Sequence, residues 1–297
     1  MNKDYDPSGK KKRQDEFGSE DGSFGLKDAV IIVLVFALIS GVMIWKTFPQ
    51  TFISCEEDQP LLTIKKDFFP ADTFQQLKQD LLAHPHTHSR QHRAKRALPH
   101  TRGQVVMFNR DGVPEFREKA AAEEMGYLAT FFDAVRHPAA NAWVVNVLVI
   151  DPKPKANGVK VFGDIDEAVA THLDGNLAVD ARQHTFLAHQ TDVLYVSVPA
   201  DMEGGALSVY PYASGGPRWK AWYKEQVKRP AENTLATFRG DAYHGVSAYY
   251  TDEEGARRVT LVLEQYAVPE AHYRRTVPYA TDDYERRHAS REAAAEL

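Results

Sequence analysis

The sequence predicts a mainly β fold with flanking helices, in which two sheets pack against each other as a jelly roll. Short apolar runs such as Trp143–Ile150 and Val193–Val198 are separated by turns rich in glycine and proline. Many short strands with such turns are typical of a sandwich or barrel. Apolar residues at helical spacing in Thr73–Ala83 and Pro114–Arg136 indicate helices beside the strands. Asp72 is the expected N-cap of the first helix.

The composition is that of a globular protein that depends on its hydrophobic core. The chain has 297 residues, of which 43% are hydrophobic and 26% charged, and its net charge of −5 gives no reason to expect nucleic-acid binding. A single cysteine, Cys55, excludes an intrachain disulfide. Its thiol is either free or links two chains, and the sequence leaves the oligomeric state open.

An uncharged apolar segment near the N-terminus predicts one transmembrane helix. Residues 29–45 carry no charge, and a helix of this length reaches about 26 Å, near the lower limit for a membrane span. The basic run Lys10–Arg13 precedes it, so residues 1–28 are expected in the cytoplasm and the rest of the chain in the lumen. A cleaved signal peptide fits less well, because the preceding polar region is long and no Ala-x-Ala site follows.

The remaining chain divides by composition into four regions. We expect a short stem at 46–66, a helical support region at 67–143, the jelly roll at 144–266 and a charged tail at 267–297. Residues 84–103 are rich in His, Arg and Lys. Alternating histidines can bind metal, but this stretch has no apolar frame, so we interpret it as a solvated loop.

Two histidines and an aspartate form the clearest chemical pattern. His172-Leu-Asp174 is followed about 70 residues later by His244. Two imidazoles and one carboxylate on one face of a metal ion form the facial triad of non-haem Fe(II) oxygenases. A competing pair is His189 with Asp192, which directly precedes the strand at Val193.

An arginine begins the last apolar strand. Arg258 starts an alternating run that continues to Tyr266, and its guanidinium can bind a carboxylate through two parallel hydrogen bonds. Thr260 faces the same side of that strand, whereas Arg257 faces the opposite side. Arg258 is therefore the better candidate for an anion site.

Taken in order, these motifs resemble those of the Fe(II)/2-oxoglutarate-dependent dioxygenases, and within them the prolyl 4-hydroxylase-like group. The resemblance covers roughly two thirds of the chain. It is carried by the His-x-Asp motif, the strand at 193–198, Glu203–Leu207, Arg239–His244, Arg258–Thr260 and the helix at 67–83. It implies a double-stranded β-helix fold with Fe(II), 2-oxoglutarate and O₂, and ascorbate as an additional reductant.

The resemblance also implies roles for individual residues. His172, Asp174 and His244 would ligate the iron, and Arg258 with Thr260 and Tyr195 would bind 2-oxoglutarate. Relatives separate the His-x-Asp motif from the next strand by a loop of ten or more residues, which favours His172 and Asp174 over the competing pair.

The implied activity is hydroxylation of a protein or peptide, with prolyl residues in the endoplasmic reticulum or Golgi as the first candidate. Two alternatives remain: a non-catalytic jelly-roll binding module, and a cupin-type metal enzyme that does not use 2-oxoglutarate. The complete set of His172, Asp174, His244 and Arg258 counts against the first. Arg258 with Thr260 counts against the second.

Overall fold

In the computed structural model of the protein, the described residues are 50–56, 58–88, 101–153, 167–175, 177, 184–211 and 225–281. None of the helices in these ranges is long and apolar enough to cross a membrane. The predicted span at 29–45 and the tail at 1–28 lie outside the described residues. Both therefore stay predictions.

The larger sheet has seven antiparallel strands in the order β15-β3-β4-β14-β7-β11-β2. In chain order the strands are β2 Leu62–Lys65, β3 Thr101–Asn109, β4 Ala142–Ile150, β7 Gln190–Ser197, β11 Thr234–Arg239, β14 Arg258–Tyr266 and β15 Tyr279–Thr281. Strands far apart in sequence are neighbours in this sheet, because β14 lies between β4 and β7.

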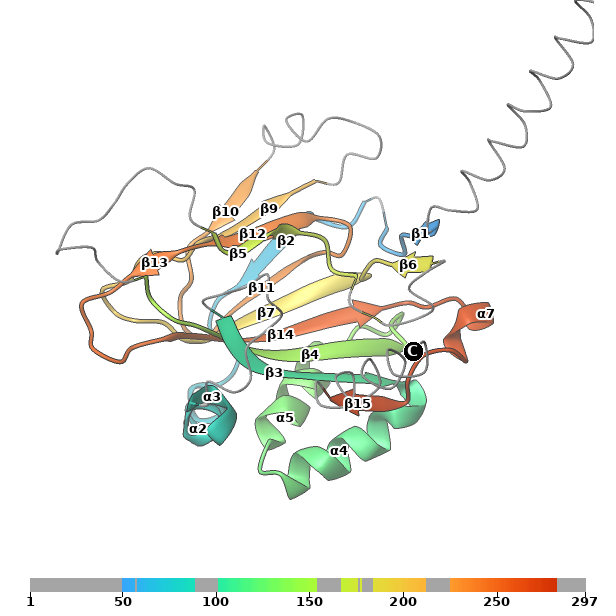
Figure 1. Ribbon diagram of the computed structural model, residues 1–297, viewed down its shortest axis with the longest axis horizontal. Coiled ribbons are helices and arrows are strands. Elements are labelled where there is room, and N and C mark those ends of the chain that lie inside the picture. The colour runs from blue at the N-terminus through green and yellow to red at the C-terminus, as the bar shows by residue number, and fades with distance from the viewer. Residues whose placement is uncertain are drawn as a thin grey trace, which may run out of the picture. The chain divides into compact units, whose positions relative to one another are not determined.

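A smaller sheet faces the larger one and has the order β10-β9-β12-β5 (Figure 1). Its strands are β5 Glu167–His172, β9 Leu207–Tyr210, β10 Gln226–Lys228 and β12 Tyr243–Ser247. Two short pairs complete the strands: β1 Gln50–Phe52 with β6 His184–Phe186, and β8 Glu203–Gly204 with β13 Tyr249–Tyr250. The mainly β prediction is confirmed, and two facing antiparallel sheets are the arrangement expected of a jelly roll.

Helices cover the other face of the larger sheet, as Figure 1 shows for α2, α4 and α5. The helical segments are α2 Ala71–Ala83, α3 Pro85–His88, η1 Arg110–Gly112, α4 Val113–Ala122, α5 Gly126–Val135 and α7 Glu270–Tyr273. On β4, Val145, Val147 and Val149 pack against the helices, while Ile150 packs in the cluster between the two sheets. This alternation follows from the two-residue period of a strand.

Two predicted boundaries differ from the structure. β2 lies in the segment 46–66 that the sequence suggested as a stem, and β15 lies in the suggested C-terminal tail. Each of these strands pairs with a strand distant in sequence, and apolar periodicity does not reveal such pairing. Asp72 is not the N-cap of α2, because the helix begins at Ala71 and Asp72 lies in its first turn.

Candidate metal centre

Two strands of the smaller sheet bring the two histidines together. His172 ends β5, His244 lies in β12, and the two residues are paired across the strands, with ring centroids 4.3 Å apart. Gly245 permits this close approach, because a Cβ at that position would lie 2.8 Å from Thr171 Oγ1 and 3.1 Å from the carbonyl oxygen of Val169. A side chain at position 245 would therefore push the strands apart beside both imidazoles.

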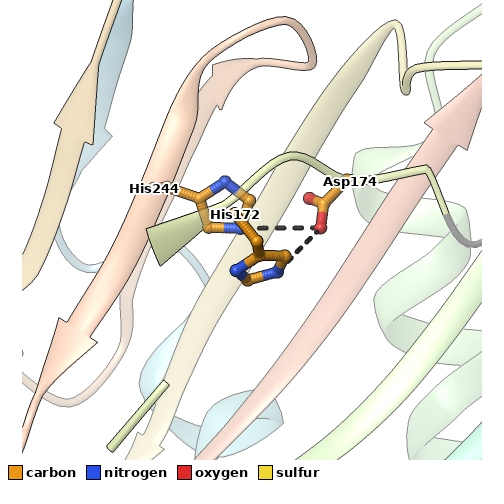
Figure 2. A group of neighbouring side chains, drawn as sticks. All are labelled: His172, Asp174 and His244. Atoms are coloured by element: carbon orange, nitrogen blue, oxygen red, sulfur yellow. Dashed lines mark ion pairs between the residues drawn. The ribbon is translucent and has the colours of Figure 1, made fainter. Parts of the chain in front are cut away.

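Asp174 follows β5 and points back toward the two rings (Figure 2). Its Oδ1 atom lies 3.4 Å from His172 Nε2 and 3.5 Å from His244 Nε2. One ligand atom from each residue lies within 4.8 Å of the other two. Three nitrogen and oxygen donors thus converge on one place and can hold a metal ion.

Backbone carbonyls orient both imidazoles. His172 Nδ1 lies 2.8 Å from the carbonyl oxygen of Ala170, and His244 Nδ1 lies 3.2 Å from that of Ala242. A carbonyl oxygen only accepts hydrogen bonds, so Nδ1 carries the proton in each ring and Nε2 presents a lone pair when the ring is neutral. This is the tautomer of a histidine that binds metal through Nε2.

Thr191 on β7 holds the carboxylate in place. Its hydroxyl donates to Asp174 Oδ2 at 2.6 Å, which leaves Oδ1 facing the imidazoles. No sequence pattern singles out Thr191, because only the strand register places it beside Asp174. A hydrogen bond of this kind orients a metal-binding carboxylate.

The three side chains shift one another's protonation. Burial raises the pKa of Asp174, but His244, His172 and Thr191 lower it to about 2. Burial lowers the pKa of His172, but the Asp174 carboxylate raises it to about 9. Burial lowers the pKa of His244, and Asp174 opposes this shift only partly. Without metal, the cluster therefore holds a proton on His172 at neutral pH.

The cluster is buried on one side and accessible on the other. The side chains of Asp174 and His244 are 4% and 9% exposed, whereas that of His172 is 40% exposed. A small molecule therefore has access from the His172 side. The remaining coordination positions of a bound metal would be available to ligands there.

Arg258 is buried with unpaired hydrogen-bond donors. The residue is 1% exposed, and its Nε and Nη1 atoms, like the Tyr195 hydroxyl, have no hydrogen-bond partner by geometry among the described residues. The Arg258 guanidinium lies 5.3 Å from the centroid of the Tyr195 ring. Burial raises the pKa of the Tyr195 phenol, and the positive charge of Arg258 opposes that shift only in part. Leaving two donors of a buried guanidinium without hydrogen-bond partners is costly, so this arrangement points to an anionic ligand.

The contacts around Arg258 agree with the predicted strand alternation. Thr260 is paired with Tyr195 and donates a long hydrogen bond of 3.4 Å to the carbonyl oxygen of Leu148. Arg257 faces the other side, where it contacts the carbonyl oxygen of Thr87 and the carboxylate of Asp151. The predicted contacts of Thr260 and Tyr195 with 2-oxoglutarate stay predictions.

The structure does not bring His189 and Asp192 into the metal cluster. His189 Nδ1 lies 2.8 Å from the carbonyl oxygen of Ser54. The Asp192 carboxylate accepts hydrogen bonds from the side chains of Gln190, Gln265 and Thr237. Within the part of the chain that the structure describes, His172, Asp174 and His244 form the group with metal-ligand spacing.

No family model and no curated protein matches the chain. Among solved structures, a prolyl-4-hydroxylase from Pseudomonas putida shares 14% identity, with 71% of this chain and 95% of that chain covered and a TM-score of 0.40. An oxidoreductase of the 2OG-Fe(II) oxygenase family from Burkholderia pseudomallei shares 14% sequence identity; the match covers 76% of this chain and 98% of that chain, with a TM-score of 0.40. A prolyl hydroxylase from Trichoplax adhaerens, in complex with a hypoxia inducible factor peptide fragment, also shares 14% sequence identity. That match covers 78% of this chain and 93% of that chain, with a TM-score of 0.40.

Proposed function

We propose that this chain is an Fe(II)- and 2-oxoglutarate-dependent dioxygenase that hydroxylates a protein or peptide substrate. The observation that carries the proposal is the convergence of His172 Nε2, His244 Nε2 and Asp174 Oδ1. In the overall reaction a substrate C–H bond, O₂ and 2-oxoglutarate give a C–OH group, succinate and CO₂. One oxygen atom of O₂ enters the hydroxyl group and the other enters succinate.

The donor set fits Fe(II). Two imidazoles and one carboxylate leave up to three positions open, which is what a co-substrate chelate and O₂ require. Bound iron would supply the activation of O₂. The protein's part is to hold the metal through the two Nε2 atoms and Asp174 Oδ1, with Thr191 fixing the carboxylate from behind.

Arg258 fits the far carboxylate of 2-oxoglutarate. A dicarboxylate that binds the metal at one end would give the unpaired Nε and Nη1 donors an anion at the other. Burial raises the pKa of Tyr195, so its hydroxyl stays protonated at neutral pH and can donate a hydrogen bond to the same ligand. The site thereby supplies a cation and a neutral donor for one carboxylate.

Neither alternative function accounts for both features. A non-catalytic binding module has no need for two imidazoles with free Nε2 lone pairs beside a buried carboxylate. A cupin-type enzyme that does not use 2-oxoglutarate leaves the buried donors of Arg258 unexplained. The dioxygenase proposal explains the metal cluster and the arginine together.

The substrate and location are finer proposals. Peptidyl proline is the residue implied by the resemblance of the sequence motifs to those of prolyl 4-hydroxylases. The charge pattern around residues 29–45 supports a type II membrane protein with its β domain in the lumen of the endoplasmic reticulum or Golgi. Ascorbate would serve there as the reductant that keeps the iron in the Fe(II) state.

The test is turnover of 2-oxoglutarate by the full-length chain. With Fe(II), O₂ and a peptide panel that includes proline-rich sequences, we expect one succinate per hydroxylated product, and we expect His172→Ala to abolish it. His189→Ala is the matched control, because that imidazole bonds to the carbonyl oxygen of Ser54 and lies outside the cluster. Stoichiometric iron without any spectral change or turnover on addition of 2-oxoglutarate would instead indicate the cupin-type alternative.

A further inference from the structure

Tyr249 is fully buried between the two sheets, and its hydroxyl has two backbone partners. The residue is 0% exposed and belongs to the apolar cluster between the sheets. Its hydroxyl accepts a hydrogen bond from Arg258 N at 3.0 Å and donates one to the carbonyl oxygen of Ile150 at 2.8 Å. Burial raises the pKa of Tyr249 to about 12, so the hydroxyl keeps its proton at neutral pH and can bond to both groups at once.

The Tyr249 hydroxyl bridges the backbones of two paired strands. Arg258, the first residue of β14, is paired with Ile150, the last residue of β4. On the other side of β14, the pairing with β7 begins at Val259 and its register shifts before Thr260. Such an irregularity locally disrupts the ladder of a sheet. The backbone of Arg258 is therefore paired on one side only, and Tyr249 supplies an additional hydrogen bond at this strand end.

The position of the Arg258 guanidinium depends on this backbone contact. Its Nε and Nη1 atoms have no hydrogen-bond partner by geometry among the described residues, and the group lies 5.3 Å from the centroid of the Tyr195 ring. Contact with a ring face restrains a guanidinium less than directional hydrogen bonds do. The place that the guanidinium takes before an anion binds is therefore set mainly by the backbone of residue 258.

Two glycines of β8 allow the close approach that places Tyr249. Tyr249 is paired with Gly204, and Gly205 N donates to the carbonyl oxygen of Ala248 at 3.1 Å. A Cβ at position 204 would lie 2.4 Å from that oxygen, and a Cβ at position 205 would lie 3.3 Å from Tyr249 Cβ. Both glycines have positive φ, 92° and 66°, which residues with a side chain rarely adopt. The glycine pair in the Glu203–Leu207 motif thus lets Tyr249 reach β14.

We propose that Tyr249 is a positioning residue for Arg258, whose backbone it fixes so that the guanidinium is already in place for the far carboxylate of 2-oxoglutarate. This inference rests on the proposed dioxygenase function. Tyr249 acts through Arg258 and not on the ligand, because its hydroxyl is already bonded to Arg258 N and to the carbonyl oxygen of Ile150. Preorganisation of this kind lowers the free-energy cost of binding. Its loss should weaken 2-oxoglutarate binding and leave the metal in place.

The first arm of the experiment is Tyr249→Phe in the full-length chain loaded with Fe(II). Anaerobic calorimetry with 2-oxoglutarate should give a dissociation constant about tenfold higher than that of the unaltered chain, which corresponds to about 1.4 kcal/mol. KM for 2-oxoglutarate should rise by a similar factor, whereas iron content and kcat at saturating 2-oxoglutarate should change less than about twofold. An unchanged dissociation constant in a folded, iron-loaded Tyr249→Phe protein overturns the inference.

Tyr273→Phe is the matched control for the loss of a buried hydroxyl. Tyr273 is 4% exposed, and its hydroxyl also accepts a hydrogen bond from a backbone N–H, that of Asp111 at 3.2 Å. This variant should lower the melting temperature about as much as Tyr249→Phe does, but should leave the dissociation constant for 2-oxoglutarate unchanged. Equal weakening of 2-oxoglutarate binding in both variants would indicate a general effect of destabilisation and would overturn the inference.

A double-mutant cycle tests whether Tyr249 acts through Arg258. If it does, adding Tyr249→Phe to Arg258→Ala should change the dissociation constant for 2-oxoglutarate less than about twofold, because the guanidinium that the hydroxyl positions is absent. A further loss of about tenfold in the double variant would mean that Tyr249 acts on the ligand by another route, and the inference would be wrong.

Amide hydrogen exchange of the unaltered chain tests the inference even if Tyr249→Phe does not fold. Without 2-oxoglutarate, the amide of Arg258 should exchange as slowly as that of Leu261 inside β14, because a buried hydrogen bond protects it. Fast exchange at Arg258 overturns the inference. An unaltered, iron-loaded chain that does not bind 2-oxoglutarate contradicts the proposed function and the inference with it, whereas binding that Tyr249→Phe leaves unchanged contradicts the inference alone.

Discussion

Replacing Arg258 with alanine is expected to weaken 2-oxoglutarate binding without removing the metal. The side chain is 1% exposed, and two of its donor atoms have no partner by geometry among the described residues. A carboxylate bound there would be buried with the arginine as its counter-ion. Truncating one partner of a buried charge pair costs about 2–5 kcal/mol, and each 1.4 kcal/mol is about tenfold in affinity. The Michaelis constant for 2-oxoglutarate should therefore rise about 30-fold or more.

The assay is succinate release at increasing 2-oxoglutarate concentration, with iron content measured on the same samples. Arg258→Lys should be intermediate, because it keeps the charge but loses the planar pair of donors. Arg257→Ala is the matched control, since Arg257 faces Thr87 and Asp151 on the other side of the strand. A normal 2-oxoglutarate dependence in Arg258→Ala, or a large change in Arg257→Ala, would refute the assignment of the co-substrate site.

Three further outcomes are expected. His172→Ala should abolish stoichiometric Fe(II) binding measured by metal analysis, whereas His189→Ala should keep it; the reverse result would make the ligand assignment wrong. Because Asp174 outweighs burial and raises the pKa of His172 to about 9, the metal-free imidazole is protonated below that pH, and a metal ion must displace the proton. Metal affinity, followed by titration, should therefore rise about tenfold per pH unit between about pH 6.5 and 8.5, and a flat profile would contradict this. Protease added to sealed microsomes should spare the chain beyond about residue 50; digestion of the β domain without detergent, or a mature N-terminus after residue 45, would refute the predicted anchor or its orientation.

The sequence by itself predicted the mainly β class, the longer helices and the residue types of the candidate metal cluster. Alternating apolar residues locate β4, β7 and β14 to within a few residues, because each strand buries one or both faces and so has a regular pattern. The same alternation assigns Arg258 and Arg257 to opposite faces of the strand. The candidate metal ligands could be recognised because His172, Asp174 and His244 are polar, metal-binding residue types within a region of apolar strands.

Only the tertiary structure decided which distant segments meet. The choice between the pairs His172–Asp174 and His189–Asp192 depends on the pairing of β5 with β12, which local periodicity does not encode. The same is true of Thr191 behind Asp174 and of Glu264 beside Asn146, since both contacts follow from register across the larger sheet. β2 and β15 were missed because short edge strands carry too few residues to show a period. Side-chain chemistry can be read one residue at a time, but the geometry of this site depends on backbone pairing between segments about 70 residues apart.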